Sequence, residues 1–293
     1  MKLAKQARLS LKGQWKGAIL AQWIVAAAGL LLLLLEVGVL RLTGLGMEQV
    51  IHLDEISGNS RLLLHALVVV GIVGLDLLLT SPLRLGQSAY YYKITEETKR
   101  EQVSSRCLRS YYRWGRYSVA VRWRLSLWIL RSMWGLICFF PAALVLGFTQ
   151  LLREQGNGEP ISAVTVLFAQ IFGLFALLAG FVALQLIMLR YMPAQYFLQE
   201  TKSVSVAIKR SRRLMRGKTG DAAWMMAGFS GWLLACVLVL PYFYVSPLYL
   251  TSRAEWVRRR EKERIEEERT EWAQTRRLDH LPKALKKGTA HSG

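Results

Sequence analysis

Four ionisable residues stand inside long apolar runs and are the first candidates for chemistry: Glu36, His65, Asp76 and Arg131. A charged side chain in lipid is costly, so such residues often mark ion or proton pathways. His65 and Asp76 are eleven positions apart, which places them on nearly the same face of a helix, about three turns apart. One hypothesis is therefore a proton or cation path through His65 and Asp76.

A structural role is the alternative for the same residues. Arg131 stands about two turns from the inner end of its run, so it could reach Asp76 and form a buried pair. Charged residues near the ends of a run can extend to the membrane surface by snorkelling. A relay would show more than two such groups along one face, and this favours the structural alternative.

Residues 203–216 predict an amphipathic helix at the membrane surface. Its apolar side carries Val204, Ala207, Ile208, Ser211, Leu214 and Met215. Its basic residues are Lys209, Arg210, Arg212, Arg213 and Arg216. Gly217 suits a helix C-terminus. Such a helix binds anionic headgroups of the inner leaflet or a partner protein. In the plainer alternative it is a connecting helix that only sets the topology.

The sequence contains no motif of a familiar catalytic or metal site. G-x-x-x-x-G-K-[ST], G-x-S-x-G and H-E-x-x-H are all missing. The three cysteines are far apart, and the four histidines lack metal-ligand spacing. We therefore expect no enzyme, no cofactor and no metal. Arginines interleaved with aromatic residues at 106–128 favour a membrane-surface segment over nucleic-acid binding.

Composition and patterning predict a polytopic bundle of transmembrane helices. Apolar residues make up 53% of the 293 residues, the mean hydropathy is +0.24 and the net charge is +19. Apolar and basic segments alternate, as in membrane proteins. Four runs are long enough to span a bilayer: residues 17–40, 62–85, 125–152 and 161–189. The first is too long for a signal peptide and lacks a cleavage site, so we expect it to be retained.

The distribution of Lys and Arg predicts the orientation. Residues 1–16 contain five, 86–124 nine, 190–221 eight and 251–293 twelve, whereas the loops at 41–61 and 153–160 contain three together. Basic loops stay in the cytoplasm, so both termini are expected there.

That orientation requires the apolar residues 222–250 to form a hairpin. We expect a helix over 219–239, a turn at Leu240-Pro241 and a return over 242–257, because proline interrupts helices. This gives about six spans; a single crossing here would give five. Residues 1–257 would form the membrane domain and 258–293 a charged cytoplasmic tail. The tail is expected to be helical at 255–277 and disordered near its end.

Three stretches resemble the bacterial integral membrane protein family called domain of unknown function 975. The start, Ala7 followed by Leu11-Lys12-Gly13-Gln14-Trp15, is similar to its opening motif, and Ser81-Pro82-Leu83-Arg84-Leu85-Gly86 to the end of its second span. The strongest likeness joins Ala207-Ile208-Lys209, Ser211, Leu214-Met215 and Gly217-Lys218 with Phe229-Ser230-Gly231-Trp232. The resemblance implies a membrane protein and brings no catalytic residues with it.

These observations predict a multi-pass plasma-membrane protein that acts as a non-enzymatic scaffold, assembly factor or accessory subunit. Its expected partners are anionic inner-leaflet lipids and a membrane protein or a second copy, but no nucleic acid. The alternative is a small transporter or channel component that uses Asp76 and His65. Small residues at Ala169, Gly173, Ala176 and Gly180 favour close helix packing within the chain over a dimer contact.

Overall fold

The computed structural model describes residues 2–42, 59–96, 103, 105–155, 163–235 and 239–279, and every regular element in these ranges is a helix. The helices at the amino-terminal half are α1 (Lys2–Ser10), α2 (Trp15–Leu42), α4 (Asn59–Ile94), the 3-10 helix η2 (Ser105–Tyr112) and α5 (Trp114–Gln155). They are followed by α6 (Ala163–Leu189), α7 (Ala194–Thr201), α8 (Val204–Leu214), α9 (Thr219–Ala235) and α10 (Val239–Asp279). The predicted all-α class is confirmed for these residues.

Four stretches are long and apolar enough to cross a membrane. They are Trp15–Leu42, Ala66–Ile94, Gly115–Leu151 and Val164–Thr201, which lie in α2, α4, α5 and α6 with its continuation into α7. Only 6–22% of the residues in their most apolar windows are buried within the chain. Apolar side chains such as Leu31, Leu67, Leu136 and Phe172 therefore face outward, as lipid-facing residues do.

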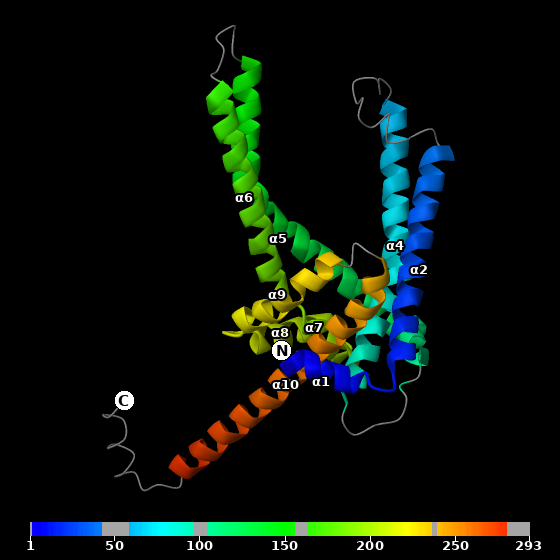
Figure 1. Cartoon of the computed structure of the whole chain (residues 1–293), viewed down its shortest axis with the longest axis vertical. Coiled ribbons are helices and arrows are strands. Elements are labelled where there is room, and N and C mark those ends of the chain that lie inside the picture. Colours follow the sequence, from blue (N-terminus) through cyan, green and yellow to red (C-terminus); the bar gives the residue numbers. More distant parts are fainter. Residues whose placement is uncertain are drawn as a thin grey trace, which may run out of the picture.

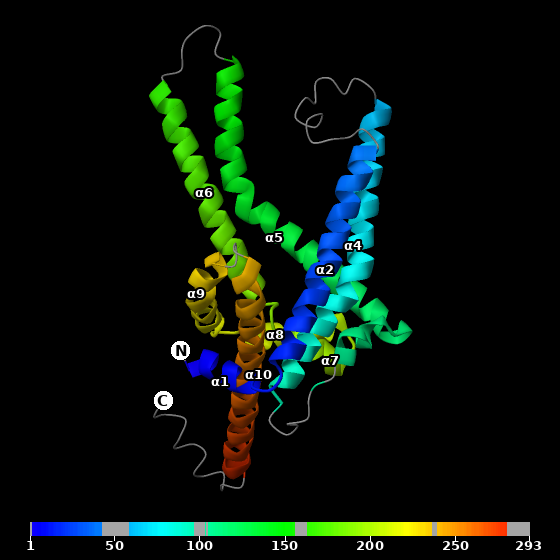
Figure 2. The same ribbon diagram turned by 45° about the vertical axis from the view of Figure 1, so that its right-hand side comes forward.

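The spans form two hairpins that rise from the same end of the molecule (Figure 1). In both views α2 runs beside α4, and α5 beside α6 (Figures 1 and 2). Small residues allow the second contact: a Cβ at Gly173 would meet the side chain of Leu146, and one at Gly180 would meet the carbonyl of Cys138. These glycines thus pack within the chain, as expected.

The densest packing lies where the hairpins meet, at the lower end of both views. There α1, η2, α7 and α8 pack around the ends of the spans and the middle of α10; we call this assembly the platform. Large side chains that are fully buried include Leu11, Tyr91, Phe197, Met215 and Val257. The platform, rather than the bilayer segments, therefore holds the protein's main core.

The last apolar region does form a hairpin, but the expected turn at Leu240-Pro241 is wrong. The helices α9 and α10 are separated before Val239, and Pro241 stands in the first turn of α10. Amide groups of a first turn have no partner within the helix, so a residue without an N–H is tolerated there. Pro247 lies inside α10, which continues past it.

The hairpin is shallower than the other two. The end of α9 and the start of α10 lie well below the upper ends of α2, α4, α5 and α6 in both views (Figures 1 and 2). Phe243 stacks on Trp23 at 4.1 Å between ring centroids, and Trp15 stacks on Tyr244 at 5.0 Å. Trp23 is only about 12 Å along α2 from its start at 1.5 Å per residue. Within the described residues, neither α9 nor α10 is among the four candidate spans.

The expected domain boundary between residues 257 and 258 does not coincide with a break in the structure. Instead, α10 runs unbroken from Val239 to Asp279, which confirms the helix expected over 255–277. Beyond the expected boundary, Arg258 pairs with Glu96 at 3.5 Å and Arg260 with Asp221 at 2.5 Å. Residues 280–293, expected to be disordered in part, lie outside the described ranges.

Candidate functional site

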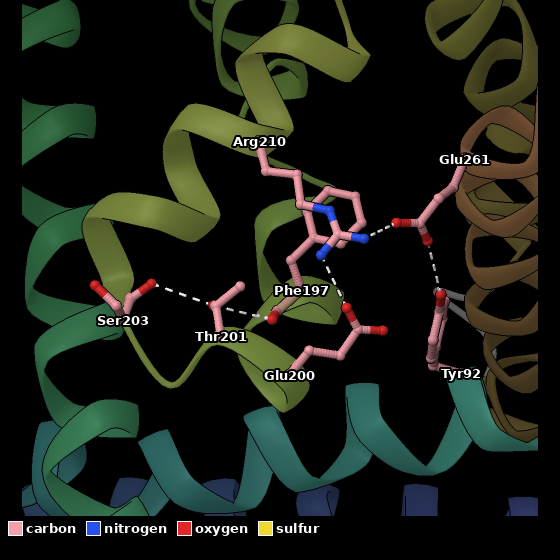
Figure 3. A network of polar contacts seen from close by, with 7 residues as sticks. All are labelled: Tyr92, Phe197, Glu200, Thr201, Ser203, Arg210 and Glu261. Carbon is pink, nitrogen blue, oxygen red and sulfur yellow. Dashed lines mark hydrogen bonds and ion pairs between the residues drawn. The ribbon is translucent and has the colours of Figure 1, made fainter. Parts of the chain in front are cut away.

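A half-buried arginine on α8 joins three helices of the platform (Figure 3). Arg210 pairs through one guanidinium nitrogen with Glu200 of α7 at 2.8 Å, and through the other with Glu261 of α10. Its guanidinium also lies over the ring of Phe197, 4.5 Å from the centroid. We call Arg210, Glu200, Glu261 and Tyr92 the clamp.

The clamp reaches the end of the second span through Tyr92. The Tyr92 hydroxyl donates to the second carboxylate oxygen of Glu261 at 3.1 Å. On its other side, Arg258 covers the Tyr92 ring at 5.3 Å and donates to Thr95 at 3.3 Å. The clamp therefore fixes the charged half of α10 against α4 and α8.

The chemistry of the clamp is electrostatic. Burial alone would lower the pKa of Arg210, but the charges of Glu261 and Glu200 and the hydrogen bonds to them raise it above its ordinary value. Arg210 therefore stays protonated at physiological pH and does not transfer protons. Among the described residues, no group of three or more His, Cys, Asp or Glu side chains is placed to hold a metal.

The other three basic residues of α8, together with Arg216 in the turn after it, form an exposed surface, which we call the α8 basic face: Lys209, Arg212, Arg213 and Arg216. At 3.6 residues per turn Lys209, Arg212 and Arg213 lie within about 100° of one another, opposite the buried Ala207, Ser211 and Leu214. None of the four belongs to an ion pair of the described residues.

Two details of the α8 prediction change. Arg210 was expected to bind lipid or a partner, but its guanidinium is already paired with Glu200 and Glu261. The helix was expected to lie on the membrane surface, but its apolar residues Ala207, Leu214 and Met215 are buried against the rest of the platform. Ser211 donates to the carbonyl of Arg190 at 2.7 Å and fixes the orientation of α8.

The expected pair between Asp76 and Arg131 is wrong for the structure described. The Asp76 carboxylate accepts a hydrogen bond from Thr80 at 3.0 Å. Arg131 is exposed and lines a cavity of about 360 Å³ with Phe181 and Leu184 of α6. Arg124 interacts electrostatically with both of them. Arg131 thus lies on the side of α5 that faces α6, because α5 and α6 form their own hairpin.

His65 lies on α4, three turns before Asp76, as expected. Its side chain is outside the part of the structure that is described. Of the two residues of the hypothetical path, the structure therefore describes the side chain of Asp76.

Sequence reasoning missed a buried chain of uncharged polar groups between the hairpins. Gln87 of α4 donates to Gln22 of α2 at 2.7 Å, and Gln22 donates to the hydroxyl of Tyr242 on α10. Both glutamines are almost fully buried. A search restricted to ionisable residues passes over amides, although an unpaired amide in lipid is also costly.

No protein-family model, curated protein or solved structure matches this chain. The resemblance to the family called domain of unknown function 975 stays a prediction from the quoted motifs. The contacts and charges of the protein's own residues are therefore the basis for a proposed function.

Proposed function

We propose that the protein is a non-enzymatic scaffold or accessory protein of the plasma membrane. In this proposal the platform lies on the cytoplasmic side, and the α8 basic face binds an anionic surface, either inner-leaflet headgroups or an acidic membrane protein. The observation that carries the proposal is the contrast within α8. Arg210 is paired with two glutamates in the clamp, whereas the four cations of the α8 basic face remain exposed and unpaired among the described residues.

The orientation is supported by where the basic residues lie. The amino-terminal helix α1, η2, α8 and the charged half of α10 all belong to the same end of the molecule (Figures 1 and 2). Basic segments of membrane proteins stay in the cytoplasm. We further propose that α9 and α10 form a re-entrant pair that enters from the cytoplasmic side and returns, in place of two full crossings.

A binding role suits the rigidity of the platform. The buried side of α8 packs into the core, and the clamp fixes its flank to α7 and α10. A cationic face held by a rigid helix loses less conformational entropy on binding than a flexible basic segment. Each exposed Lys or Arg near an anionic leaflet contributes about 1 kcal/mol.

A photocrosslinking amino acid in place of the exposed Ser205, beside the α8 basic face, tests the proposal in the protein's own membrane. We expect a phospholipid or protein adduct, which mass spectrometry identifies. The adduct should disappear when Lys209, Arg212, Arg213 and Arg216 are all replaced by Gln. As a control, the same crosslinker at the exposed Thr270 of α10 should give no lipid adduct. An absent adduct at Ser205, or one that survives the four substitutions, contradicts the proposal.

A further inference from the structure

A cavity of about 500 Å³ lies between α6 and the α9–α10 hairpin, at the level where the spans meet the platform. Its walls come from five helices and the turn after α6, and include Trp123, Phe181, Leu186, Met192, Met226 and Tyr249. Ligand pockets in proteins are typically about 300–1,000 Å³, so the cavity is large enough for part of an amphipathic molecule.

The cavity is continuous with the lipid-facing surface of α6. Phe181, Val182 and Leu186 line it and are 50%, 50% and 43% exposed, although they belong to a candidate span. Three methionines, Met188, Met192 and Met226, complete the apolar wall. Their flexible, polarisable side chains adapt to ligands of irregular shape. An acyl chain can therefore pass from the bilayer into the cavity without crossing a polar barrier.

One cation lies at the platform end of this apolar cavity. Arg253 of α10 is half-buried, its guanidinium lies over Tyr249 at 5.4 Å, and its Nε is buried without a hydrogen-bond partner. Among the described residues it forms no ion pair. In contrast, four later arginines of the same helix each have a carboxylate partner: Arg258, Arg259, Arg260 and Arg264. Gln185 and Gln195 also line the cavity.

We propose that this cavity binds an anionic phospholipid of the cytoplasmic leaflet. The phosphate lies against the Arg253 guanidinium and the two glutamines, and an acyl chain lies along Phe181, Val182 and Leu186. A guanidinium matches phosphate geometry with paired hydrogen bonds, and the ligand's charge neutralises the unpaired Arg253. The site is separate from the α8 basic face, because none of the four residues of that face lines the cavity.

A photoactivatable phospholipid tests the proposal. Purified full-length protein is placed in phosphatidylcholine nanodiscs that contain a little diazirine-labelled phosphatidylglycerol, and labelled peptides are mapped after illumination. We expect labelling within residues 181–189, and competition by unlabelled phosphatidylglycerol but not by oleate. Arg253→Gln should reduce this labelling roughly tenfold, because a charge-assisted contact is lost. Arg259→Gln, an exposed arginine outside the cavity, is the matched control and should label like the parent protein.

A cavity-filling substitution keeps the test decisive if Arg253→Gln impairs folding. Ala223→Phe leaves Arg253 in place but fills space in the cavity, and should also abolish labelling at 181–189. Thermal unfolding in the same nanodiscs identifies variants that remain folded. Equal labelling by a phosphatidylcholine probe, full labelling in a folded Arg253→Gln protein, or displacement by oleate alone would overturn the proposal.

Discussion

Two arginines of the platform have opposite surroundings and therefore different roles. Arg210 contacts two glutamates and an aromatic ring, so its charge stabilises the packing of α8 against α7 and α10. Arg253 is bordered by apolar side chains and a tyrosine ring, without a carboxylate partner among the described residues. Burial of an uncompensated charge is costly, which favours a ligand at Arg253 and a structural role at Arg210.

The clamp predicts a measurable coupling between Arg210 and Glu261. Arg210→Met should lower the free energy of unfolding by about 2 kcal/mol, because among the described residues Glu261 then keeps only the hydrogen bond from Tyr92. In a double-mutant cycle with Glu261→Gln, we expect a coupling energy of about 1–2 kcal/mol. Denaturant titration of the purified protein in detergent measures both quantities.

An exposed pair on α10 provides the control for this cycle. Arg259 is 59% exposed and pairs with Glu263 at 2.9 Å, so Arg259→Met should change stability by no more than about 0.5 kcal/mol. Equal losses for Arg210→Met and Arg259→Met would show that the clamp is no stronger than an ordinary surface pair.

The contacts of Asp76 predict that replacing it changes the stability of the protein rather than a transport activity. An asparagine oxygen can still accept the hydrogen bond from Thr80, but the negative charge near Arg124 is lost. We therefore expect Asp76→Asn to cost about 1 kcal/mol of stability and to leave proton flux unchanged in proteoliposomes loaded with a pH-sensitive dye. If the parent protein shows a pH-dependent flux and the folded Asp76→Asn protein lacks it, the transport alternative is correct.

Between elements, α4 approaches η2 closely at Gly86. At Gly86 a Cβ would collide with the backbone carbonyl of Leu108. A backbone obstacle cannot rotate away as a flexible side chain can, so the two helices would have to separate. This gives a physical reason for glycine in the Ser81–Gly86 stretch that resembles the end of the family's second span.

Two glycines of α4 allow a matched test of the close contact between α4 and η2. Gly86→Ala should destabilise the protein by about 1–3 kcal/mol, because it overpacks the contact with η2. Gly74→Ala adds the same methyl group where no described residue has an atom within 4 Å, and should be neutral or stabilising by up to about 1 kcal/mol, since alanine favours helix. Thermal unfolding of both variants in the same detergent measures the difference; equal effects would rule out a close α4–η2 contact.

Sequence patterns predicted the elements whose environment is set by local composition. The four spans follow from apolar length, and the buried side of α8 from residues spaced three and four apart, with Ala207, Ser211 and Leu214 inward. The position of Pro241 was misjudged because proline disrupts a helix interior but not its first turn. A propensity alone does not tell which of these positions a proline occupies.

The candidate sites were harder to predict because their partners come from distant parts of the chain. Glu261 is 51 positions from Arg210 and 169 from Tyr92, so no local pattern connects them. The same holds for Arg253, whose cavity combines α5, α6, α7, α9 and α10. Arg131 was assigned to Asp76 by depth in the membrane, but depth does not fix the side of a helix that a residue occupies.

In the whole molecule, most of the buried residues lie in the platform and not along the most apolar stretches of the spans. The spans bury few of their residues within the chain, while the platform contains the fully buried aromatic and aliphatic side chains. The α9–α10 hairpin joins these parts, since Tyr242 and Phe243 contact α2 and Glu255 accepts a hydrogen bond from Ser10 of α1 at 2.7 Å. A re-entrant hairpin explains how one helix can contact both a span and the platform.

The proposed topology makes two linked predictions about sidedness and depth. A reporter fused after Gly293 should be active in the cytoplasm, because the basic end of α10 lies with the platform. An external reporter would leave an odd number of crossings and remove the tail from cytoplasmic partners.

Cys236 reports the depth of the hairpin, because it stands between α9 and α10 in the sequence. Two full crossings would bring it to the outer surface, whereas a re-entrant pair leaves it inside the bilayer. The stacked Trp23 and Phe243 favour the second arrangement, since α2 continues for about 28 Å beyond Trp23. In a variant with Cys107 and Cys138 replaced by Ala, a membrane-impermeant maleimide added to intact cells should leave Cys236 unmodified. A cysteine introduced at Asn157, which stands between α5 and α6 in the sequence, should react and serves as the positive control. Rapid modification of Cys236 from outside would instead establish six full crossings.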